Sequence, residues 1–214
     1  EAVGVSAPGP DVESLARDGV RHVPLTASTR AMDPLADLRA AAELWRILRR
    51  ERPDVLHTHN PKPGLYGRVV GRLARVPIVV NTNHGLYATA DHGRLRRTAV
   101  LGMEAVAARF SHAELVQNPE DLDLLLRRRV NRRSRTRLLG NGIDLQRFRP
   151  GALDPAERAA LRAELGAGPD DVVVGMVGRL VAEKGVLELL AAARLLGDRY
   201  VVVVIGPDDP AKPD

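Results

Sequence analysis

The feature that most constrains the fold of this chain is the regular alternation of short β-branched runs with longer amphipathic segments. Runs such as "DVLHTHN" (residues 54–60), "PIVVNTNH" (77–84) and "VVVGMV" (172–177) are typical of buried strands, and segments of helical periodicity separate them. Units of about 30 residues are the usual length of parallel strands joined by crossover helices. The sequence therefore predicts an α/β chain with Rossmann-like parallel sheets and helices on both faces.

Two of the predicted helices begin with recognisable caps, at Asp33-Pro34 and at Asn118-Pro119, where a polar side chain precedes a proline at the first helical position. Further helices are expected over about residues 64–76, 95–110, 155–165 and 186–196. In the helix that follows Asp33, the helical spacing predicts a buried face made of Leu35, Leu38, Ala42, Trp45 and Leu48.

Composition excludes several classes of protein. The 214 residues contain no cysteine, which rules out disulfide frameworks, thiol nucleophiles and thiolate metal sites. No apolar run reaches the ~18 residues of a membrane-spanning helix, and the start "EAVGVSAPGP" lacks the basic and apolar regions of a signal peptide. These features predict a cytoplasmic protein. The formal net charge of +5 favours an anionic partner, although a general bias toward arginine explains the charge equally well.

The segment "GNGIDLQRFRPGALDP" (residues 140–155) interrupts the alternation and is rich in Gly, Pro and Asp. We interpret it as a linker between an N-terminal Rossmann-like domain, residues 1–148, and the start of a second domain, residues 149–214. Two parallel strands with their helices follow the linker. These elements alone are too few to form a stable domain. The first residues also read as the middle of a strand, so we expect the chain to be truncated at both ends.

Polar residues follow several predicted strands at the point where each strand ends. Ligands of doubly wound sheets bind at the carboxyl ends of the strands, so the recurrence of these residues predicts a cleft at that edge. The residues are His57, His59 and Asn60; Asn83, His84 and Gly85; Gln117 and Asn118; Asn141 and Gly142; residues 178–185; and residues 206–209.

Histidines and aspartates near this edge raise the question of a metal site. His57 and His59 alternate along one strand, and we expect them to point to opposite faces of the sheet, one toward the cleft and one beneath a helix. Such an orientation would prevent them from binding one metal ion together. Asp208 and Asp209 lie in a proline-rich loop and are expected to form a turn rather than a metal site. The histidines interpreted as structural or surface residues are His22, His92 and His112.

The turn "GRLVAEKG" (residues 178–185) carries the sharpest chemical signal. It joins a buried strand to a helix, and it contains a lysine in a chain whose basic residues are almost all arginine. Gly178 allows a tight backbone turn, Arg179 offers a planar fork for phosphate oxygens, and Lys184 adds a compact positive charge. The next helix contributes its N-terminal amides. These groups suit a diphosphate; the alternative is a solvated turn in which Glu183 pairs with a neighbour.

The motifs "GNGIDLQRFRP" and "VGMVGRLVAEKGVLELLAAA", together with "DVLHTHNPKPGLYGR", "VVNTNHGLY" and "FSHAELVQNPEDL", cover nearly the whole chain. In these motifs the sequence resembles the family 4 glycosyltransferases of the GT-B fold. The resemblance implies transfer of a sugar from a nucleotide-diphosphate donor with retention at the anomeric carbon. It also implies that no cofactor and no obligatory metal ion take part.

The same resemblance implies roles for individual residues. Gly178, Arg179 and Lys184 would hold the donor diphosphate, and His84 would face the sugar or the acceptor as the catalytic-site histidine. The residues expected on the acceptor side or at the hinge are His59, Asn60, Asn83, Gly85, Asn118, Asn141 and Gly142. The family's glycine-rich loop after the first strand and its glutamate pair in the second domain are not in this sequence. We therefore expect an incomplete donor site and no transfer by this fragment alone.

The segment "RRRVNRRSRTR" (residues 127–137) is predicted to be exposed and partly mobile, because its arginines repel one another and no local acidic partner follows them. A solvated helix end is the plain interpretation. The sharper one is peripheral attraction to an anionic membrane, at the inner face where lipid-linked acceptors reside. Nucleic acid is not expected, because aromatic residues make up only 3% of the chain and no RNA-binding motif is present.

Three functions remain open on the sequence alone. The leading one is retaining glycosyl transfer from a nucleotide sugar to a sugar or lipid-linked acceptor, as in polysaccharide biosynthesis. The second is a nucleotide-sugar epimerase of the same fold, which the linker and "GRLVAEKG" motifs favour less. The third is a non-enzymatic basic module that binds polyanions through residues 127–137.

Overall fold

The computed structural model describes residues 1–9, 12–29, 33–59, 61–86 and 93–208. The chain divides into two compact units, residues 1–142 and 143–214, and each is described by itself. This division lies inside the segment interpreted as a linker, slightly before the boundary expected after residue 148. Every strand pair in the described part of both units is parallel, so the fold class predicted from the sequence is confirmed.

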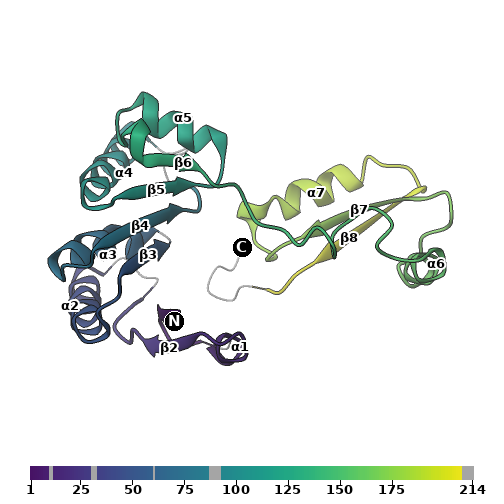
Figure 1. The fold of residues 1–214 in the computed structure, drawn as a ribbon. Coiled ribbons are helices and arrows are strands. Elements are labelled where there is room, and N and C mark those ends of the chain that lie inside the picture. The colour runs from purple at the N-terminus through teal and green to yellow at the C-terminus, as the bar shows by residue number, and fades with distance from the viewer. Residues whose placement is uncertain (10–11, 30–32, 60, 87–92, 209–214) are drawn as a thin grey trace. The chain divides into compact units, whose positions relative to one another are not determined.

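Unit 1 contains two parallel sheets (Figure 1), one with the order β1-β2 and one with the order β3-β4-β5-β6. The strands are β1 (Val3–Ser6), β2 (Arg21–Pro24), β3 (Val55–His59), β4 (Ile78–Asn83), β5 (Ala113–Val116) and β6 (Thr136–Leu138). The helices are α1 (Val12–Arg17), α2 (Pro34–Glu51), α3 (Pro61–Leu73), α4 (Arg94–Ala107) and α5 (Pro119–Arg127), with 3-10 turns η1 (Ala108–Phe110) and η2 (Arg133–Arg135). Because the strands are parallel, they all end at one edge of the sheet and the connecting helices end at the other.

Helix α2 begins as its cap predicts but buries a different face. Asp33 Oδ1 accepts hydrogen bonds from the amides of Leu35 and Ala36 at 2.9 and 3.1 Å. The buried residues are Ala40, Leu44, Ile47 and Leu48, whereas Leu35, Leu38, Ala42 and Trp45 are exposed. The predicted face was therefore wrong except for Leu48. Apolar residues lie on more than one side of this helix, and contact with β2, α3 and β4 selects one of them.

Helix α3 lies close to the sheet because one of its faces consists of glycines. A Cβ atom at Gly64 or Gly67 would come within 2.8 Å of a side chain of β4 or β3, and one at Gly71 would come within 2.6 Å of Leu56. These contacts are tighter than real Cβ atoms allow. The spacing of the glycines places them on one side of the helix, which therefore sits directly on the strands.

A buried polar network joins α3 and α4 to the strands. Arg68 is 1% exposed, and its guanidinium lies 2.8 Å from Glu104 and 2.9 Å from Glu114. Asn81 donates to Glu114 at 2.9 Å and accepts from Thr58 at 2.8 Å. Burial alone would lower the pKa of Arg68, but its hydrogen bonds and charge interactions with the two glutamates outweigh burial and raise that pKa. The sequence analysis did not predict this network.

Unit 2 pairs β7 (Val172–Val177) with β8 (Tyr200–Ile205) in parallel. Helix α6 (Pro155–Glu164) precedes β7, and a 3-10 turn η3 (Ala182–Lys184) leads into α7 (Val186–Ala193). Asp154 caps α6, since its Oδ1 accepts from the amides of Ala156 and Glu157 at 2.7 and 2.9 Å. The elements follow the sequence prediction, although α7 ends earlier than expected. In the described part of the chain, no helix has the length and apolar character needed to cross a bilayer.

Candidate functional site

Three histidine rings gather where β3 and β4 end, at the carboxyl edge of the larger sheet. His59 Nδ1 lies 2.9 Å from His84 Nε2, and the rings of His57 and His59 have centroids 4.2 Å apart. His57 Nε2 lies 2.7 Å from Thr82 Oγ1. His57 and His59 therefore point to the same side of the sheet, and the expectation of opposite faces was wrong. Side chains alternate along a strand with a period of two, so residues i and i+2 share a face.

The histidine cluster favours uncharged rings. In the contact between His59 and His84 one ring nitrogen donates and the other accepts, so at least one of the two rings is neutral. Burial lowers the pKa of His59, and the charges of His57 and His84 lower it further. Burial and the charge of His84 also lower the pKa of His57. A neutral imidazole can both donate and accept a hydrogen bond, which suits contact with a sugar hydroxyl.

The backbone after His84 turns sharply and is fastened to α5. Gly85 has φ 131°, in the region that favours glycine, and its amide donates to Asn83 Oδ1 at 3.1 Å. The next amide, that of Leu86, donates to Asp121 Oδ2 at 3.1 Å. Asn83 and Gly85 therefore shape the loop that carries His84.

Asn118, predicted both as a helix cap and as a cleft residue, is a cap in the structure. Its Oδ1 accepts from the amide of Asp121 at 2.7 Å, and its Nδ2 donates to Asp121 Oδ2 at 2.9 Å. Both ends of the Asn118 amide are thus occupied locally. Asp121 links this cap to the loop after His84, which places Asn118 at the border of the candidate site.

No hydrogen bond in the described residues joins His84 to the remaining residues predicted for the cleft. Asn141 and Gly142 are exposed in the segment after β6. Asn60 lies outside the described residues, as do His92 and Asp209. His22 contacts Ser6 at 3.0 Å, and His112 Nδ1 accepts from the amide of Val79 at 2.9 Å, so both have structural partners.

In unit 2, the turn at residues 178–185 follows the end of β7 as predicted. Arg179 lies 2.8 Å from Glu183, and both side chains are nearly half exposed. The pairing of Glu183 matches the alternative considered from the sequence, so Arg179 is engaged within its own turn. Lys184 is exposed, and no ion pair in the described residues involves it. Gly185 adopts a left-handed conformation with φ 79° and begins α7 without a side-chain cap.

Hydrogen bonds to the loop after β8 support this turn. Gly178 donates to Ile205 at 2.9 Å, and Leu180 donates to Pro207 at 3.0 Å. A Cβ atom at Gly206 would lie 1.7 Å from the carbonyl oxygen of Gly178, so only glycine fits there. Val181, which is 2% exposed, anchors the centre of the turn. The conformation that presents Arg179 and Lys184 is therefore fixed by backbone contacts.

The sequence analysis missed two residues that shape the site in unit 1, Thr82 and Asp121. It placed Gly206 in the predicted cleft but did not predict its contact with Gly178. Thr82 is 1% exposed and binds His57, and Asp121 anchors the loop after His84. Position in the chain offered a partial signal, because Thr82 lies next to Asn83 and Asp121 lies in the first turn of a capped helix. Their contacts join residues of different strands and helices, which a local pattern does not reveal. Among the described residues no group of histidines and carboxylates is arranged to hold a metal ion.

Solved structures define the class of protein to which this fold belongs. Anabaena HepE, crystallised in complex with UDP and glucose, aligns with a TM-score of 0.74 at 19% identity, over 98% of this chain and 54% of that one. Sucrose-phosphate synthase from Thermosynechococcus elongatus aligns with a TM-score of 0.66 at 22% identity, over 100% of this chain and 61% of that one. The fold is that of the GT-B glycosyltransferases.

Residues 2–147 match Glycosyltransferase Family 4. The chain belongs to this family, which confirms the identification made from the sequence motifs.

Two curated relatives illustrate the match. The chain is 28% identical over 186 residues to the Escherichia coli UDP-Gal:alpha-D-GlcNAc-diphosphoundecaprenol alpha-1,3-galactosyltransferase, an alignment that covers 86% of this chain and 47% of that protein. It is 33% identical over 167 residues to the D-inositol 3-phosphate glycosyltransferase of Saccharomonospora viridis, covering 72% of this chain and 37% of the relative. The chain thus spans about half, or less, of the length of these relatives.

Proposed function

We propose that this chain is part of a retaining glycosyltransferase that moves a sugar from a nucleotide-diphosphate sugar to an acceptor of the cell envelope. The observation that carries the proposal is the turn at residues 178–185, which presents two basic side chains at the carboxyl end of β7 in a member of this family. The names of the relatives support the substrate class, since one includes a UDP-sugar donor and a diphosphoundecaprenol-linked acceptor.

The proposed chemistry depends on charge that develops on the leaving group. As the bond between the sugar and the diphosphate breaks, negative charge grows on the diphosphate oxygens, and fixed positive groups stabilise it. Lys184 is available for this role without rearrangement. Arg179 would exchange Glu183 for a phosphate oxygen, at small cost because an exposed ion pair contributes only about 0–1 kcal/mol. We propose that these groups act without a metal ion or cofactor.

In the proposal, His84 contacts the sugar or the acceptor in the complete enzyme. The hydrogen bond with His59 orients the His84 ring, and Asn83 and Gly85 set the direction of the loop that carries it. Asn118 supports the loop through Asp121, while Asn60, Asn141 and Gly142 stay expectations for the acceptor side and the hinge. The reaction would take place in the cytoplasm, with the enzyme peripheral to the inner face of the membrane when its acceptor is lipid-linked.

Steady-state kinetics of the full-length enzyme with its donor test the proposal. Lys184→Ala should lower kcat more than it raises the Kd for the donor, because the contact strengthens as the leaving group becomes charged. Arg158→Ala, which removes an exposed positive charge from α6 in the same unit, is the matched control and should leave kcat unchanged. If Lys184→Ala kept the wild-type kcat and kcat/KM, the turn would have a purely structural role.

The stereochemistry and the reaction class are tested separately. NMR of the product should show the anomeric configuration of the donor sugar, as a retaining enzyme requires. Consumption of the donor without any acceptor, with release of an epimerised nucleotide sugar, would instead establish the epimerase alternative.

A further inference from the structure

The arginines of residues 127–137 are all exposed, as predicted, and several of them surround a hollow of ≈ 550 Å³. The hollow is lined by Asp123, Leu126, Arg127, Arg129, Asn131, Arg132 and Arg133. It forms where α5 ends and the chain approaches the start of β6. Because α5 begins at the carboxyl edge of the sheet and returns toward the amino edge, this hollow lies at the opposite edge from the histidine cluster.

Positive charge in the hollow exceeds negative charge. Arg127 forms an ion pair with Asp123, the one acidic residue in the lining. Among the described residues, Arg129, Arg132 and Arg133 form no ion pair. The carbonyl of Arg132 accepts from Thr136 at 2.9 Å, which fixes the backbone at this position. Like charges held this close repel one another, so an anion between them would be stabilised.

Asn131 provides an observation independent of charge. It is 8% exposed, and neither its Oδ1 nor its Nδ2 has a hydrogen-bond partner. Buried side-chain amides are nearly always paired, so the unpaired amide of Asn131, a residue that lines this hollow, can pair with a group bound there. An amide donor beside several guanidinium groups matches the oxygens of a tetrahedral oxyanion.

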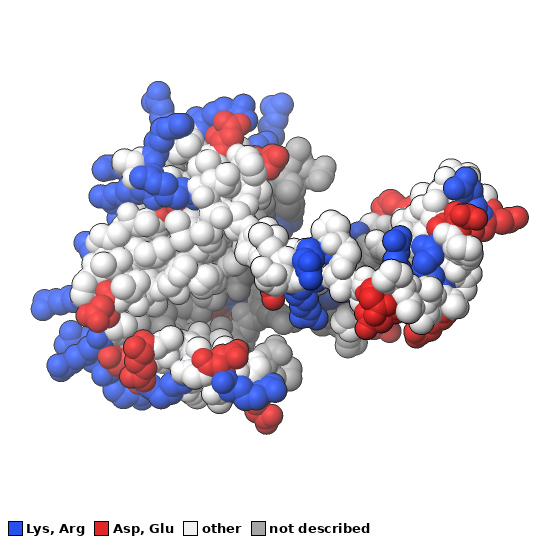
Figure 2. Space-filling model, turned by 45° about the vertical axis from the view of Figure 1, so that its right-hand side comes forward, with Lys and Arg blue, Asp and Glu red and all other residues white. Residues whose placement is uncertain are grey.

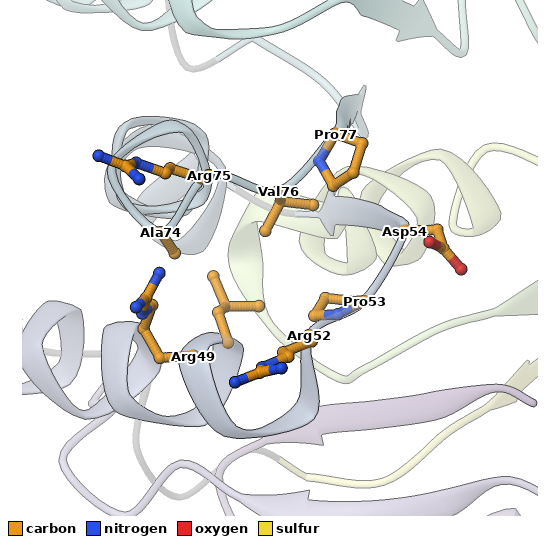
Figure 3. Close-up of a pocket in the computed structure, with 9 residues that line it drawn as sticks. Arg49, Arg52, Pro53, Asp54, Ala74, Arg75, Val76 and Pro77 are labelled. Carbon is orange, nitrogen blue, oxygen red and sulfur yellow. The ribbon is translucent and has the colours of Figure 1, made fainter.

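A second hollow at this edge of the sheet is lined in part by arginines, has no unpaired amide among its described residues, and serves as a comparison. It measures ≈ 280 Å³ and is lined in part by Arg49 and Arg52 at the end of α2 and Arg75 after α3 (Figure 3). These three guanidinium groups do not converge on one point in Figure 3, and no unpaired amide lines this hollow in the described residues. Interaction with the negative ends of the helices explains these arginines, but it does not explain Asn131.

Lys and Arg side chains lie along much of the visible margin of unit 1 (Figure 2), so general attraction of anions must be separated from a built site. We propose that the hollow formed by Arg127, Arg129, Asn131, Arg132 and Arg133 binds a phosphate or pyrophosphate group. This site consists of other residues than the turn at residues 178–185 and does not depend on the proposed function. The group can belong to a soluble molecule or to a lipid headgroup.

Titration of the whole chain with inorganic pyrophosphate, followed by calorimetry and by the side-chain amide NMR signal of Asn131, tests the site. Arg132→Gln/Arg133→Gln should weaken binding about ten-fold or more, since each charge-assisted contact contributes strongly. Arg49→Gln/Arg52→Gln removes the same charge from the second hollow and should change the Kd by less than about two-fold. Equal weakening by both pairs would show diffuse attraction and overturn the proposal.

Asn131→Leu separates binding from folding. Replacing an unpaired buried amide by an apolar side chain of similar size should leave the urea midpoint of the free chain unchanged or raise it. The same variant should bind pyrophosphate more weakly than the wild type. Unchanged binding in both Asn131→Leu and Arg132→Gln/Arg133→Gln would overturn the proposal.

Vesicles identify the source of the group. Binding to vesicles that contain phosphatidic acid, lost in Arg132→Gln/Arg133→Gln and displaced by pyrophosphate, would support the site and assign it to a lipid headgroup. Pyrophosphate binding without vesicle binding would support the site and assign it to a soluble molecule. Vesicle binding that neither the variant nor pyrophosphate affects, together with no binding of pyrophosphate, would exclude the site.

Discussion

His59 Nδ1 and His84 Nε2 lie 2.9 Å apart although 25 residues separate them in the chain. Parallel pairing of β3 with β4 aligns His59 with Thr82, which brings the loop after β4 to the same edge. The ring centroid of His57 lies 4.2 Å from that of His59, so three histidine rings gather at this edge. Burial lowers the pKa of His57 and of His59, so the charge of these two rings changes only below the ordinary histidine pKa.

Stability should fall in mildly acidic solution because of this cluster. The pKa values of His57 and His59 are lowered in the folded chain, so below the ordinary histidine pKa of about 6.5 the unfolded chain binds more protons. The stabilising contribution is present above that pH and is lost as pH falls through the lowered pKa values. Urea unfolding at about pH 7.5 and about pH 5.5 should show the difference. The difference should shrink in His57→Gln/His59→Gln; an identical pH response in that variant would contradict the prediction.

Removal of Arg68 should be among the most damaging single changes in unit 1. Arg68→Met would leave Glu104 and Glu114 facing one another without a positive charge, in a place where Glu114 is 3% exposed. Breaking a buried ion pair in this way costs about 3–5 kcal/mol of unfolding free energy. Urea denaturation of the chain measures the loss, and Arg39→Met, at an exposed position, is the control.

A second substitution tests the reason for that loss. Adding Glu114→Gln to Arg68→Met should recover part of the stability, because one uncompensated carboxylate is removed. Strictly additive effects of the two changes would show that lost packing, rather than unpaired charge, explains the result.

Much of the fold could be predicted because its signals are local. The start of α2 at Pro34 follows from Asp33 and the proline, and β7 follows from a run of valines between polar turns. The turn at residues 178–185 could be found in the same way, since Arg179 and Lys184 lie within one short segment between a strand and a helix. In each case the residues that determine the element are neighbours in the sequence.

The features that sequence reasoning missed depend on tertiary contacts. Arg68 and Glu114 are 46 residues apart, and nothing in either segment identifies the other as its partner. The buried side of α2 depends on which of its apolar faces the rest of unit 1 covers. Helical periodicity alone therefore predicted the wrong face. The orientation of His57 and His59 was predictable, however. Residues i and i+2 of a strand share a face, so the prediction of opposite faces was wrong.

Asn118 should prove to be a structural residue first. Asn118→Ala would leave the amide of Asp121 without its cap and should cost about 0.5–2 kcal/mol. Asn118→Ser restores a capping oxygen and should recover most of that loss. Urea unfolding compares the three proteins. Equal stability of the alanine variant and the wild type would indicate instead that Asn118 serves ligand binding alone.

Gly206→Ala should disorder the turn at residues 178–185 without replacing Arg179 or Lys184. Its Cβ would meet the carbonyl oxygen of Gly178 at 1.7 Å, and because that atom belongs to the backbone, no side-chain adjustment relieves the clash. The loss of stability should lie at the upper end of the ~1–3 kcal/mol that overpacking usually costs. Gly197→Ala, where nothing lies within 4 Å of the new Cβ, is the matched control.

Hydrogen exchange locates the effect of Gly206→Ala. The amides of Gly178 and Leu180 donate to Ile205 and Pro207 at 2.9 and 3.0 Å, and these two hydrogen bonds lie on either side of the clash. Both amides should exchange faster in Gly206→Ala and at the wild-type rate in Gly197→Ala, while amides of β4 in unit 1 keep their protection. In the full-length enzyme the same variant should weaken donor binding, because the backbone that aims Lys184 is no longer fixed. Unchanged exchange at Gly178 and Leu180 would mean that the turn keeps its conformation without the support of the β8 loop.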